Sequence, residues 1–420
     1  MAAAKVAPCG AWKSPITSEL IVSETISLGK PLLDGEDIYW LEGRPAEGGR
    51  NVIVKRTPDG TLTDLLPQPF NARTRVHEYG GGSFTVHEGT VYFSNYSDQR
   101  LYRLPPGGQP EPLTPEMELR YADGVIDVLH RQMICVREDH RASNHEALNT
   151  IVGLNLTGDP KGGQVLTAGN DFYATPRLSP DGRQLAWLTW EHPNMPWDAT
   201  ALWVARVLVD GRLDAPRLIA GGADESIYQP AWSPDGVLHF ISDRTGWWNL
   251  YRWREGRVEP LLPMAAEFGE PQWVFGMSTY DFIGPESIIT TYTQDGSWHV
   301  ARLDSGSGEL QPFKTPYTSL SAPQVGPLGV ALRVGAPTQA AAIVLFDLEM
   351  QEHQILRSSS AVEVSAGYLS VPEPVEFPTT AGLTAHGLFY APQNAAYTVP
   401  AGELPPLLVF IHGGPTGAAS

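Results

Sequence analysis

Several features are scarce or missing in this sequence, and each absence narrows what the protein can be. Only two cysteines, Cys9 and Cys135, occur among 420 residues, which is too few for a disulfide framework and is typical of a reducing compartment. No apolar run approaches the roughly 18 residues that a membrane-spanning helix needs. The amino terminus is too short and too weakly apolar to be a signal peptide. We therefore expect a cytoplasmic location and no membrane partner.

Positive charge is also scarce, with 29 basic against 47 acidic side chains and a net charge of −18. An acidic surface argues against nucleic acid and anionic membranes as partners. His140 and His145, together with Glu138, Asp139 and Glu146, are the one cluster that suggests a metal. Their spacing matches no usual zinc pattern and they fall in one polar turn, so we predict no metal and no cofactor.

A serine nucleophile of the kind found in α/β-hydrolases is missing as well. It needs Gly-x-Ser-x-Gly on a strand–turn–helix, and no such pentapeptide occurs in these 420 residues. The nearest match, Asp304-Ser305-Gly306-Ser307-Gly308, fails at its first position and follows an alternating stretch, so it is better explained as a hairpin turn. The 420-residue chain is thus expected to lack a nucleophile and to be inactive alone.

What the sequence has in quantity is glycine (42), proline (37) and aromatic residues (10%), a profile that favours many short strands. A repeat is visible in two copies, Pro176–Gly182 and Pro230–Gly236, each ending in Ser-Pro-Asp-Gly. Proline sets φ at the first corner of such a turn and glycine takes the position with positive φ. Alternating strands follow each copy, and four strands per unit with a period near 50 residues indicate a β-propeller blade.

Weaker copies extend the repeat over most of the chain. They show the second and third strands of a blade at 37–41 with 51–54, 91–94 with 100–103, 133–136 with 150–153, 287–290 with 298–300, and 329–332 with 342–345. With the two clear copies this gives seven units of the TolB/WD40-like kind. We predict an all-β fold with a seven-bladed propeller over residues 31–370, preceded by a lead-in at 1–30 that is weakly helical around 18–22. The tryptophans are expected mainly to pack between blades.

A second unit is predicted at 371–420. Residues 375–377 and 388–391 have the pattern of two strands of a new sheet, and a flexible polar loop at 392–403 leads into Leu407–Ile411. That apolar run is expected to be a buried central strand, and His412-Gly413-Gly414-Pro415 follows it as a strand-to-loop turn. Without partner strands and helices, the run would leave apolar side chains in water and a strand edge open to homo-oligomerisation or self-association.

Taken together, these motifs resemble the prolyl oligopeptidase family of serine peptidases, in its acylaminoacyl-peptidase and dipeptidyl-aminopeptidase-like branch. The supporting signatures span the chain: Trp12–Ile16, Glu78–Gly82, Arg137–His140, His192–Asp198 and His412–Pro415. The resemblance implies that residues 371–420 begin a truncated α/β-hydrolase domain, that the lead-in packs with it, and that the propeller caps an active site with a Ser-Asp-His triad. It also implies that Gly414 gives an oxyanion N–H and that Gly413 belongs to the oxyanion loop. All three triad residues would lie beyond Ser420.

The turns between second and third strands should emerge on one face of the propeller. They carry a concentration of charge, including Arg137, Glu138, Asp139 and Asp198. We predict that this face looks toward the hydrolase domain, where its acidic groups could meet a substrate's free amine; a plain solvated rim is the alternative.

Two classes of function remain open: part of a peptidase or acyl-peptide hydrolase that cleaves short peptides, with the propeller gating access, or a non-catalytic propeller that acts as a binding scaffold. An in-frame Gly-x-Ser-x-Gly downstream of codon 420 would favour the first, and a genuine stop the second.

Overall fold

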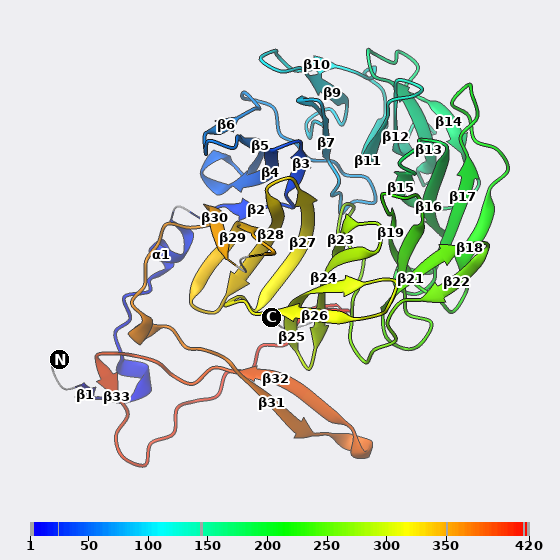
Figure 1. Cartoon of the computed structure of the whole chain (residues 1–420). Helices are drawn as coiled ribbons and strands as arrows, with labels where there is room; N and C mark the ends of the chain where they lie inside the picture. Colours follow the sequence, from blue (N-terminus) through cyan, green and yellow to red (C-terminus); the bar gives the residue numbers. More distant parts are fainter. Residues whose placement is uncertain (1–3, 24, 143–145, 350–351, 415, 418–420) are drawn as a thin grey trace.

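The computed structural model describes residues 4–23, 25–142, 146–349, 352–414 and 416–417. Within these residues, seven sheets of four or five strands stand in a ring around a common axis (Figure 1). Each sheet is built from strands that are consecutive in the chain and pair antiparallel. The prediction of an all-β, seven-bladed propeller is therefore confirmed.

The blades follow one another in chain order, with the first strand of each nearest the axis. Their strands are, in blade 1, β2 (Ser27–Leu28), β3 (Leu32–Asp34), β4 (Asp37–Arg44), β5 (Arg50–Arg56) and β6 (Leu62–Asp64); in blade 2, β7 (Phe84–His87), β8 (Thr90–Ser94), β9 (Leu101–Leu104) and β10 (Glu111–Pro112); in blade 3, β11 (Leu119–Asp127), β12 (Gln132–Asp139), β13 (Leu148–Asn155) and β14 (Gln164–Thr167). They continue in blade 4 with β15 (Phe172–Leu178), β16 (Gln184–Trp190), β17 (Ala201–Arg206) and β18 (Arg217–Gly221); in blade 5 with β19 (Ile227–Trp232), β20 (Leu238–Ser242), β21 (Asn249–Arg254) and β22 (Arg257–Pro260); in blade 6 with β23 (Tyr280–Gly284), β24 (Ser287–Gln294), β25 (Ser297–Asp304) and β26 (Leu310–Phe313); and in blade 7 with β27 (Ser319–Gly326), β28 (Gly329–Ala336), β29 (Gln339–Phe346) and β30 (His353–Ser358).

The Ser-Pro-Asp-Gly repeat forms the turn between the first and second strands of blades 4 and 5. In blade 4, the Ser179 hydroxyl donates to Asp181 at 2.6 Å, and the amide of Gln184 donates back to the Ser179 oxygen at 2.9 Å. Gly182 closes the turn with φ of 67°, a conformation that a side chain disfavours. The serine, the aspartate and the glycine each have a distinct role, which is why the tetrapeptide recurs at blade spacing.

The innermost strands of four blades share a β-bulge that the sequence did not predict. In blades 3, 4, 5 and 7 the pairing of the first two strands shifts at a β-bulge. One residue at each bulge has positive φ: Asp123, Thr175, Gln229 and Ala322. Two of these side chains reach the next blade: Asp123 accepts from the Thr175 amide at 2.9 Å, and Gln229 accepts from the Thr279 amide at 2.6 Å. The bulges thus link neighbouring blades near the axis.

Large side chains fill the space between blades, as predicted. Trp40, Trp187 and Phe240 are at most 2% exposed and belong to clusters that span adjacent sheets. Trp247 differs, because 43% of its surface is exposed and it contributes little to the core. Burial of this kind, at about 25 cal/mol per Å² of apolar surface, is the main force that holds the blades together.

The ring closes between blades 1 and 7 through side chains rather than through a shared sheet. Ile343 and Leu356 of blade 7 pack with Trp40 and Val52 of blade 1. The Glu42 carboxylate, 1% exposed, accepts from the Arg357 guanidinium at 2.7 Å across the seam. No strand crosses from one of these blades to the other in the described residues, so closure depends on these side-chain contacts and on a backbone hydrogen bond from the Ile26 amide to the Ser359 carbonyl at 2.8 Å.

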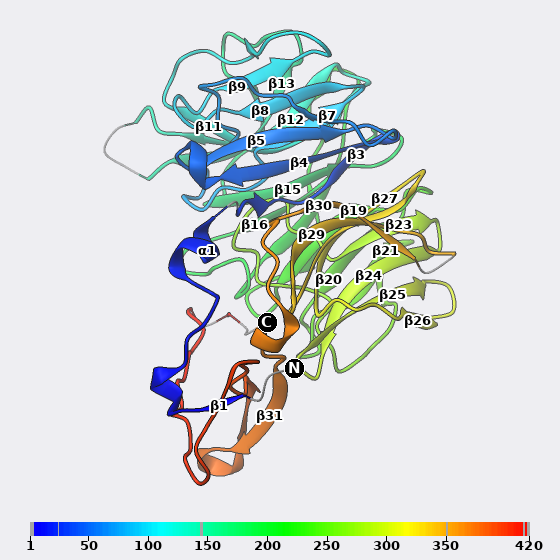
Figure 2. The ribbon, with the colours of Figure 1, turned by 90° about the vertical axis from the view of Figure 1, so that its left-hand side faces the viewer.

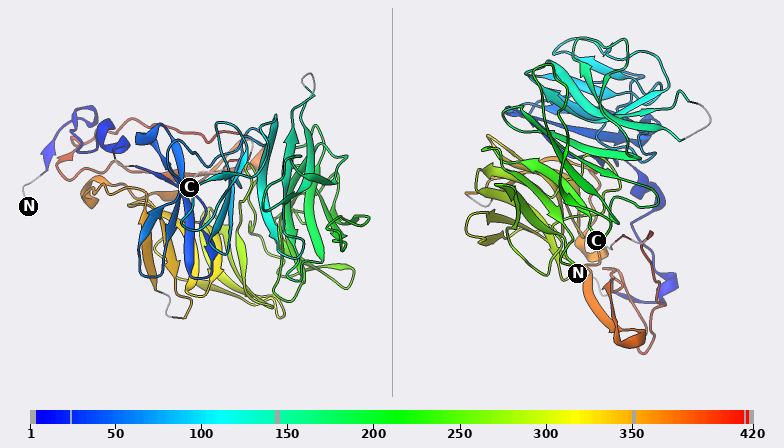
Figure 3. Two further views of the ribbon diagram at one scale, coloured as in Figure 1. Left: turned by 90° about the horizontal axis from the view of Figure 1, so that it is seen from above. Right: turned by 90° about the vertical axis from the view of Figure 1, so that its right-hand side faces the viewer.

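Residues before blade 1 and after blade 7 lie together along one face of the propeller (Figure 3). The lead-in contains β1 (Lys5–Val6), the 3-10 turn Cys9–Ala11 and α1 (Ser18–Val22), and the predicted helix at 18–22 is confirmed. β1 pairs in parallel with β33 (Tyr397–Thr398), and the indole of Trp12 stacks on Tyr397. Figure 2 shows β1 of the lead-in beside the C-terminal segment below the ring.

The segment after blade 7 gives a mixed result. β31 (Glu373–Pro378) and β32 (Thr384–Phe389) form the expected pair as an antiparallel hairpin, with the short 3-10 turn Thr380–Gly382 between them. Two further 3-10 turns lie elsewhere in the chain, at Pro45–Glu47 and Ala366–Tyr368. The run Leu407–Ile411, predicted as a buried strand of a hydrolase sheet, is not a strand in the described residues: it has no strand partner, and Phe410 is 91% exposed, as expected where the partner strands and helices are missing. A lone extended segment cannot be a central strand, because both edges and both faces need partners. In the described part of the chain, no helix is long and apolar enough to cross a membrane.

Candidate functional site

The candidate site begins where two long loops meet over the propeller axis. One loop joins blade 1 to blade 2 and the other joins blade 5 to blade 6, so they start on opposite sides of the ring. The amide of Phe275 donates to the Gly80 carbonyl at 2.9 Å, and Gly81 bridges Phe275 in parallel. A Cβ on Gly81 would lie 2.4 Å from the Phe275 carbonyl oxygen, so only glycine permits this approach.

An aromatic cavity of about 260 Å³ opens beside this crossing. The crossing loops contribute one part of its lining and blade 4 the other. The ring-bearing residues around it are His77, Tyr79, Phe172, Trp190, Trp273 and Phe275, and the turn after β16 adds Met195 and Pro196. The cavity lies on the face where the second and third strands of each blade are joined.

His77 is the centre of the cavity's inner wall. Its imidazole meets Phe172 and Trp190 edge-on at 5.2 and 5.3 Å between ring centroids, and Phe275 at 4.7 Å. Burial lowers the pKa of His77 to about 3, while the neighbouring Asn149 side chain acts in the opposite direction. The ring is therefore neutral at physiological pH, and the wall presents no charge to the cavity.

Trp273 forms the outer wall and connects the cavity to the C-terminal segment. Its indole packs on Trp197 at 4.3 Å and meets Tyr79 edge-on at 5.4 Å. The indole Nε1 donates to the Thr416 hydroxyl at 3.1 Å, and a Cβ built on Gly414 would lie 3.5 Å from Cζ2 of the same ring. One indole thus touches both the cavity and the glycine loop.

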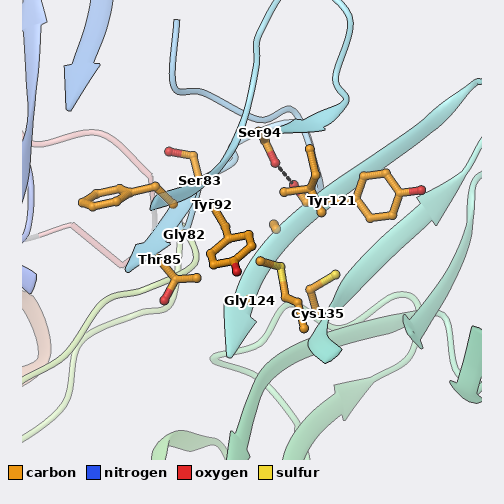
Figure 4. A pocket seen from close by; sticks show the side chains of 12 residues that line it. Gly82, Ser83, Thr85, Tyr92, Ser94, Tyr121, Gly124 and Cys135 are labelled. Carbon is orange, nitrogen blue, oxygen red and sulfur yellow. Dashed lines mark hydrogen bonds between the residues drawn. The ribbon is translucent and has the colours of Figure 1, made fainter. Parts of the chain in front are cut away.

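A second, smaller cavity lies between blades 2 and 3 and is not a candidate site. Its volume is about 10 Å³, and Figure 4 shows Ser83, Ser94, Tyr121 and Cys135 around it. The Ser94 hydroxyl donates to the Tyr121 carbonyl at 2.8 Å, and burial raises the pKa of the Cys135 thiol. A space of this size holds at most one water, and a buried protonated thiol is a poor nucleophile.

The predicted oxyanion residues lie on the propeller side of the C-terminal segment. Gly414 has φ of 68°, which suits glycine, and both Gly413 and Gly414 are exposed. Pro415, the last residue of the motif, lies outside the described residues. Their assignment to an oxyanion loop stays a prediction.

Three of the four predicted substrate-binding residues are consecutive at the end of β12, the fourth lies in the turn after β16, and each already has partners. Arg137 is buried and donates to the Gly162 carbonyl at 3.1 Å, while Asp139 pairs with Arg141 at 2.6 Å. Asp198 accepts from the Met195 amide at 2.9 Å within its own turn.

Two of the four touch residues that line the cavity: Asp198 through the Met195 amide, and Glu138, whose carboxylate accepts from the His77 amide at 2.7 Å and lies 3.0 Å from His140 Nε2. Glu138 therefore holds the loop that carries His77. His145, from the metal cluster that we considered, lies outside the described residues, and elsewhere in the described chain no group of three or more His, Cys, Asp or Glu is placed to hold a metal.

Sequence reasoning missed the aromatic residues that build the cavity. Trp190 was expected mainly to pack between blades, and it both does so and lines the cavity. Trp273 and Phe275 belong to no repeat. The available signal was Glu78–Gly82, since three consecutive glycines with positive φ indicate close approach of another backbone.

Comparison with solved structures shows what the chain is similar to. A puromycin-hydrolyzing peptidase of Mycobacterium tuberculosis matches with a TM-score of 0.92 and 36% identity over 98% of this chain and 65% of its own. A puromycin hydrolase matches with a TM-score of 0.90 and 34% identity over 98% of this chain and 66% of its own. Prolyl oligopeptidase B from Galerina marginata shares the fold at 11% identity, with a TM-score of 0.65 over 86% of this chain and 55% of its own. The predicted resemblance to the prolyl oligopeptidase family is confirmed by these structural neighbours.

The similarity to the puromycin-hydrolysing relatives covers 98% of this chain, and so runs through the propeller and both flanking segments. The chain spans about two thirds of the length of the puromycin-hydrolysing relatives. Comparisons with models of protein families and with curated protein sequences find no match.

Proposed function

We propose that this chain is the propeller and oxyanion-loop part of a serine peptidase that cleaves short peptides by acyl transfer. In this proposal the propeller covers the active site and restricts which substrates reach it. The triad would come from sequence that continues beyond Ser420, since the 420 residues contain no Gly-x-Ser-x-Gly. The proposal includes a cytoplasmic location, a peptide substrate and no nucleic-acid or membrane partner.

The observation that carries the proposal is the similarity, at 34–36% identity over 98% of the chain, to a puromycin-hydrolyzing peptidase and a puromycin hydrolase. The contact between Trp273 and the Gly414 loop adds support, because it places the candidate oxyanion loop over the propeller face that holds the aromatic cavity. An oxyanion hole must be fixed before substrate arrives, and a packed indole is a suitable support.

The exposed apolar run Leu407–Ile411 also supports a hydrolase domain, because such a domain would bury it. Its five side chains are between 72% and 91% exposed, and burying each would contribute about 1.5–3 kcal/mol. We propose that these residues become the central strand of an α/β-hydrolase sheet, with the hairpin of β31 and β32 and the lead-in packed on the same domain. The chain would then divide as the sequence suggests, with residues 31–370 in the propeller and residues 1–30 and 371–420 in the hydrolase domain.

The direct test is to express the coding sequence including whatever follows codon 420, next to the 420-residue chain. We expect the longer product to hydrolyse puromycin and aminoacyl anilides and to react stoichiometrically with a fluorophosphonate probe. The 420-residue chain should do neither, because an oxyanion loop without a nucleophile and base does not catalyse acyl transfer. If the longer product is also inactive and unlabelled, the alternative of a non-catalytic binding scaffold is favoured.

A second experiment tests the role of Gly414 in the longer product. Gly414→Pro removes the backbone N–H, whereas Gly414→Ala keeps it and loses only the glycine's freedom at positive φ. Loss of one oxyanion donor costs roughly 100- to 1,000-fold in kcat. We expect the proline variant to be slower than the alanine variant by about that factor, and equal rates in both would exclude Gly414 as a donor.

A further inference from the structure

A group of four charged side chains lies near the axis of the propeller, and none of them lines either cavity described above. Asp123, Arg177 and Asp281 belong to the innermost strands of blades 3, 4 and 6, which are β11, β15 and β23. Lys30 lies in the break between β2 and β3, at the inner edge of blade 1. Electrostatic interactions join Lys30 to the other three residues. We call these four residues the axial cluster.

The two carboxylates of the axial cluster already have close partners. Asp123 accepts from the Arg177 guanidinium at 3.0 Å and from one backbone amide at 2.9 Å. Asp281 accepts from two backbone amides, at 2.9 and 2.7 Å. Groups other than Lys30 therefore hold both carboxylates in place.

The Lys30 ammonium is the member of the cluster without a close partner. In the described part of the chain no acceptor stands within hydrogen-bonding or ion-pairing distance of it. Burial lowers the pKa of Lys30 to about 8, and of its three charged neighbours the Arg177 guanidinium has the largest effect, in the same direction. The ammonium is therefore still mostly charged at pH 7. A charge held deep in a protein without a partner is costly, so a ligand that supplies the partner gains affinity.

Solvent reaches the axial cluster even though it lies deep in the ring. Lys30 and Asp281 keep partly exposed side chains, and 28% of the Arg177 side chain is exposed. Arg177 donates through its two terminal nitrogens to Asp123 and to the Pro176 carbonyl, and its Nε has no acceptor among the described residues. The three N–H groups of Lys30 and the Nε–H of Arg177 thus remain to bind a ligand, and both side chains are positively charged.

We propose that Lys30 and Arg177 form a binding site for one small monovalent anion near the axis of the propeller. The anion supplies the acceptor that the ammonium lacks, and hydrogen bonds from charged donors are about twice as strong as neutral ones. Asp123 and Asp281 select against divalent anions, because each carboxylate repels a double charge twice as strongly as a single one. Chloride and a carboxylate, whether acetate or the terminus of a peptide, share this chemistry. The site does not depend on the peptidase function proposed above.

The test is calorimetric titration of sodium acetate and of sodium chloride into the 420-residue chain at pH 7, with sodium sulfate as the divalent probe and sodium HEPES holding the ionic strength constant. Saturable binding of a monovalent anion is expected, with weaker binding of sulfate, whereas general salt effects favour sulfate. Tighter binding of acetate identifies a carboxylate site, and tighter binding of chloride a halide site. Lys30→Met should weaken binding roughly 10- to 100-fold, because a charged donor is lost. Lys161→Met, which removes an exposed lysine, should leave the affinity unchanged.

A pH series separates Lys30 from the other charged groups of the cluster. Binding should weaken about 10-fold between pH 7 and pH 9, because the Lys30 ammonium, with a pKa of about 8, loses its proton over this range. Lys30→Arg keeps the charge and does not titrate, so it should bind equally at both pH values, and it tests the site even where Lys30→Met fails to fold.

The proposal is overturned if neither monovalent anion binds saturably, which would leave water alone as the partner of Lys30. Sulfate binding more tightly than both, or a Lys30→Met affinity within about 3-fold of the wild type, would overturn it as well. A pH dependence that persists in Lys30→Arg would assign the titration to another group and refute the role of Lys30.

Discussion

Replacing Gly81 by alanine should break the contact between the two loops that cross the propeller axis. Gly81 has φ of 89°, which costs an alanine about 1–2 kcal/mol. The new Cβ would also lie 2.4 Å from the oxygen and 2.6 Å from the nitrogen of the Phe275 backbone. Backbone atoms cannot turn away as a flexible side chain can, so overpacking adds about 1–3 kcal/mol. The expected loss in the free energy of unfolding is roughly 2–5 kcal/mol.

Gly236→Ala is the matched control, because Gly236 has φ of 83° but no atom within 4 Å of its ideal Cβ. It should lose only the backbone contribution of about 1–2 kcal/mol. Urea unfolding followed by tryptophan fluorescence gives both values, and hydrogen exchange at the Phe275 amide reports on the loop contact itself. Equal losses in the two variants, with the Phe275 amide still protected in Gly81→Ala, would refute the reasoning.

Three further predictions concern stability. Burial lowers the pKa of His77 to about 3 and of His239 to about 4, so below about pH 6.5 the unfolded chain binds more protons than the folded chain. The free energy of unfolding should therefore fall by about 1.4 kcal/mol per pH unit for each histidine until the pH approaches 4. His77→Phe should remove about half of this slope, and an unchanged slope would contradict the assignment. Glu42→Ala should cost about 1–3 kcal/mol, because the buried Trp40 indole N–H and the Arg357 guanidinium lose their acceptor at the seam between blades 1 and 7. Glu111→Ala in an exposed pair should cost less than about 1 kcal/mol, and similar urea midpoints would argue against closure through Glu42. Limited proteolysis of the 420-residue chain should cut first within 392–403, and first cuts inside the blades would contradict this.

The propeller could be predicted because its information is local and repeated. Ser179, Asp181 and Gly182 define a turn by themselves, and the alternating strands on either side need only their own pattern to choose a face. Repetition at blade spacing then makes even weak copies readable. The inner-strand bulges were not predictable in this way, because Asp123 and Gln229 have no shared residue type and are defined by partners in the next blade.

The apolar run Leu407–Ile411 shows the opposite case, in which a clear local pattern is not enough to form a strand in these 420 residues. Its composition is that of a buried strand, but a strand exists only when its backbone groups are paired. In the described residues neither edge of the run has a partner, so the segment stays extended and exposed. A strand prediction from composition is thus conditional on the neighbours that the sheet supplies.

The candidate site was the least predictable part because it is assembled from distant segments. His77, Phe172, Trp190 and Trp273 are separated by up to 196 positions in the chain (273 − 77 = 196), and none of them stands in a catalytic motif. What brings them together is the crossing of two inter-blade loops, which depends on the absence of a Cβ at Gly81. A run of three glycines therefore fixed the geometry of an aromatic cavity whose other walls lie in blade 4 and in the loop before blade 6. The residues that give such a site its shape need not be those that give it chemistry, which is why motif reasoning located the glycine loop at 413–414 but not the cavity that lies across Trp273 from it.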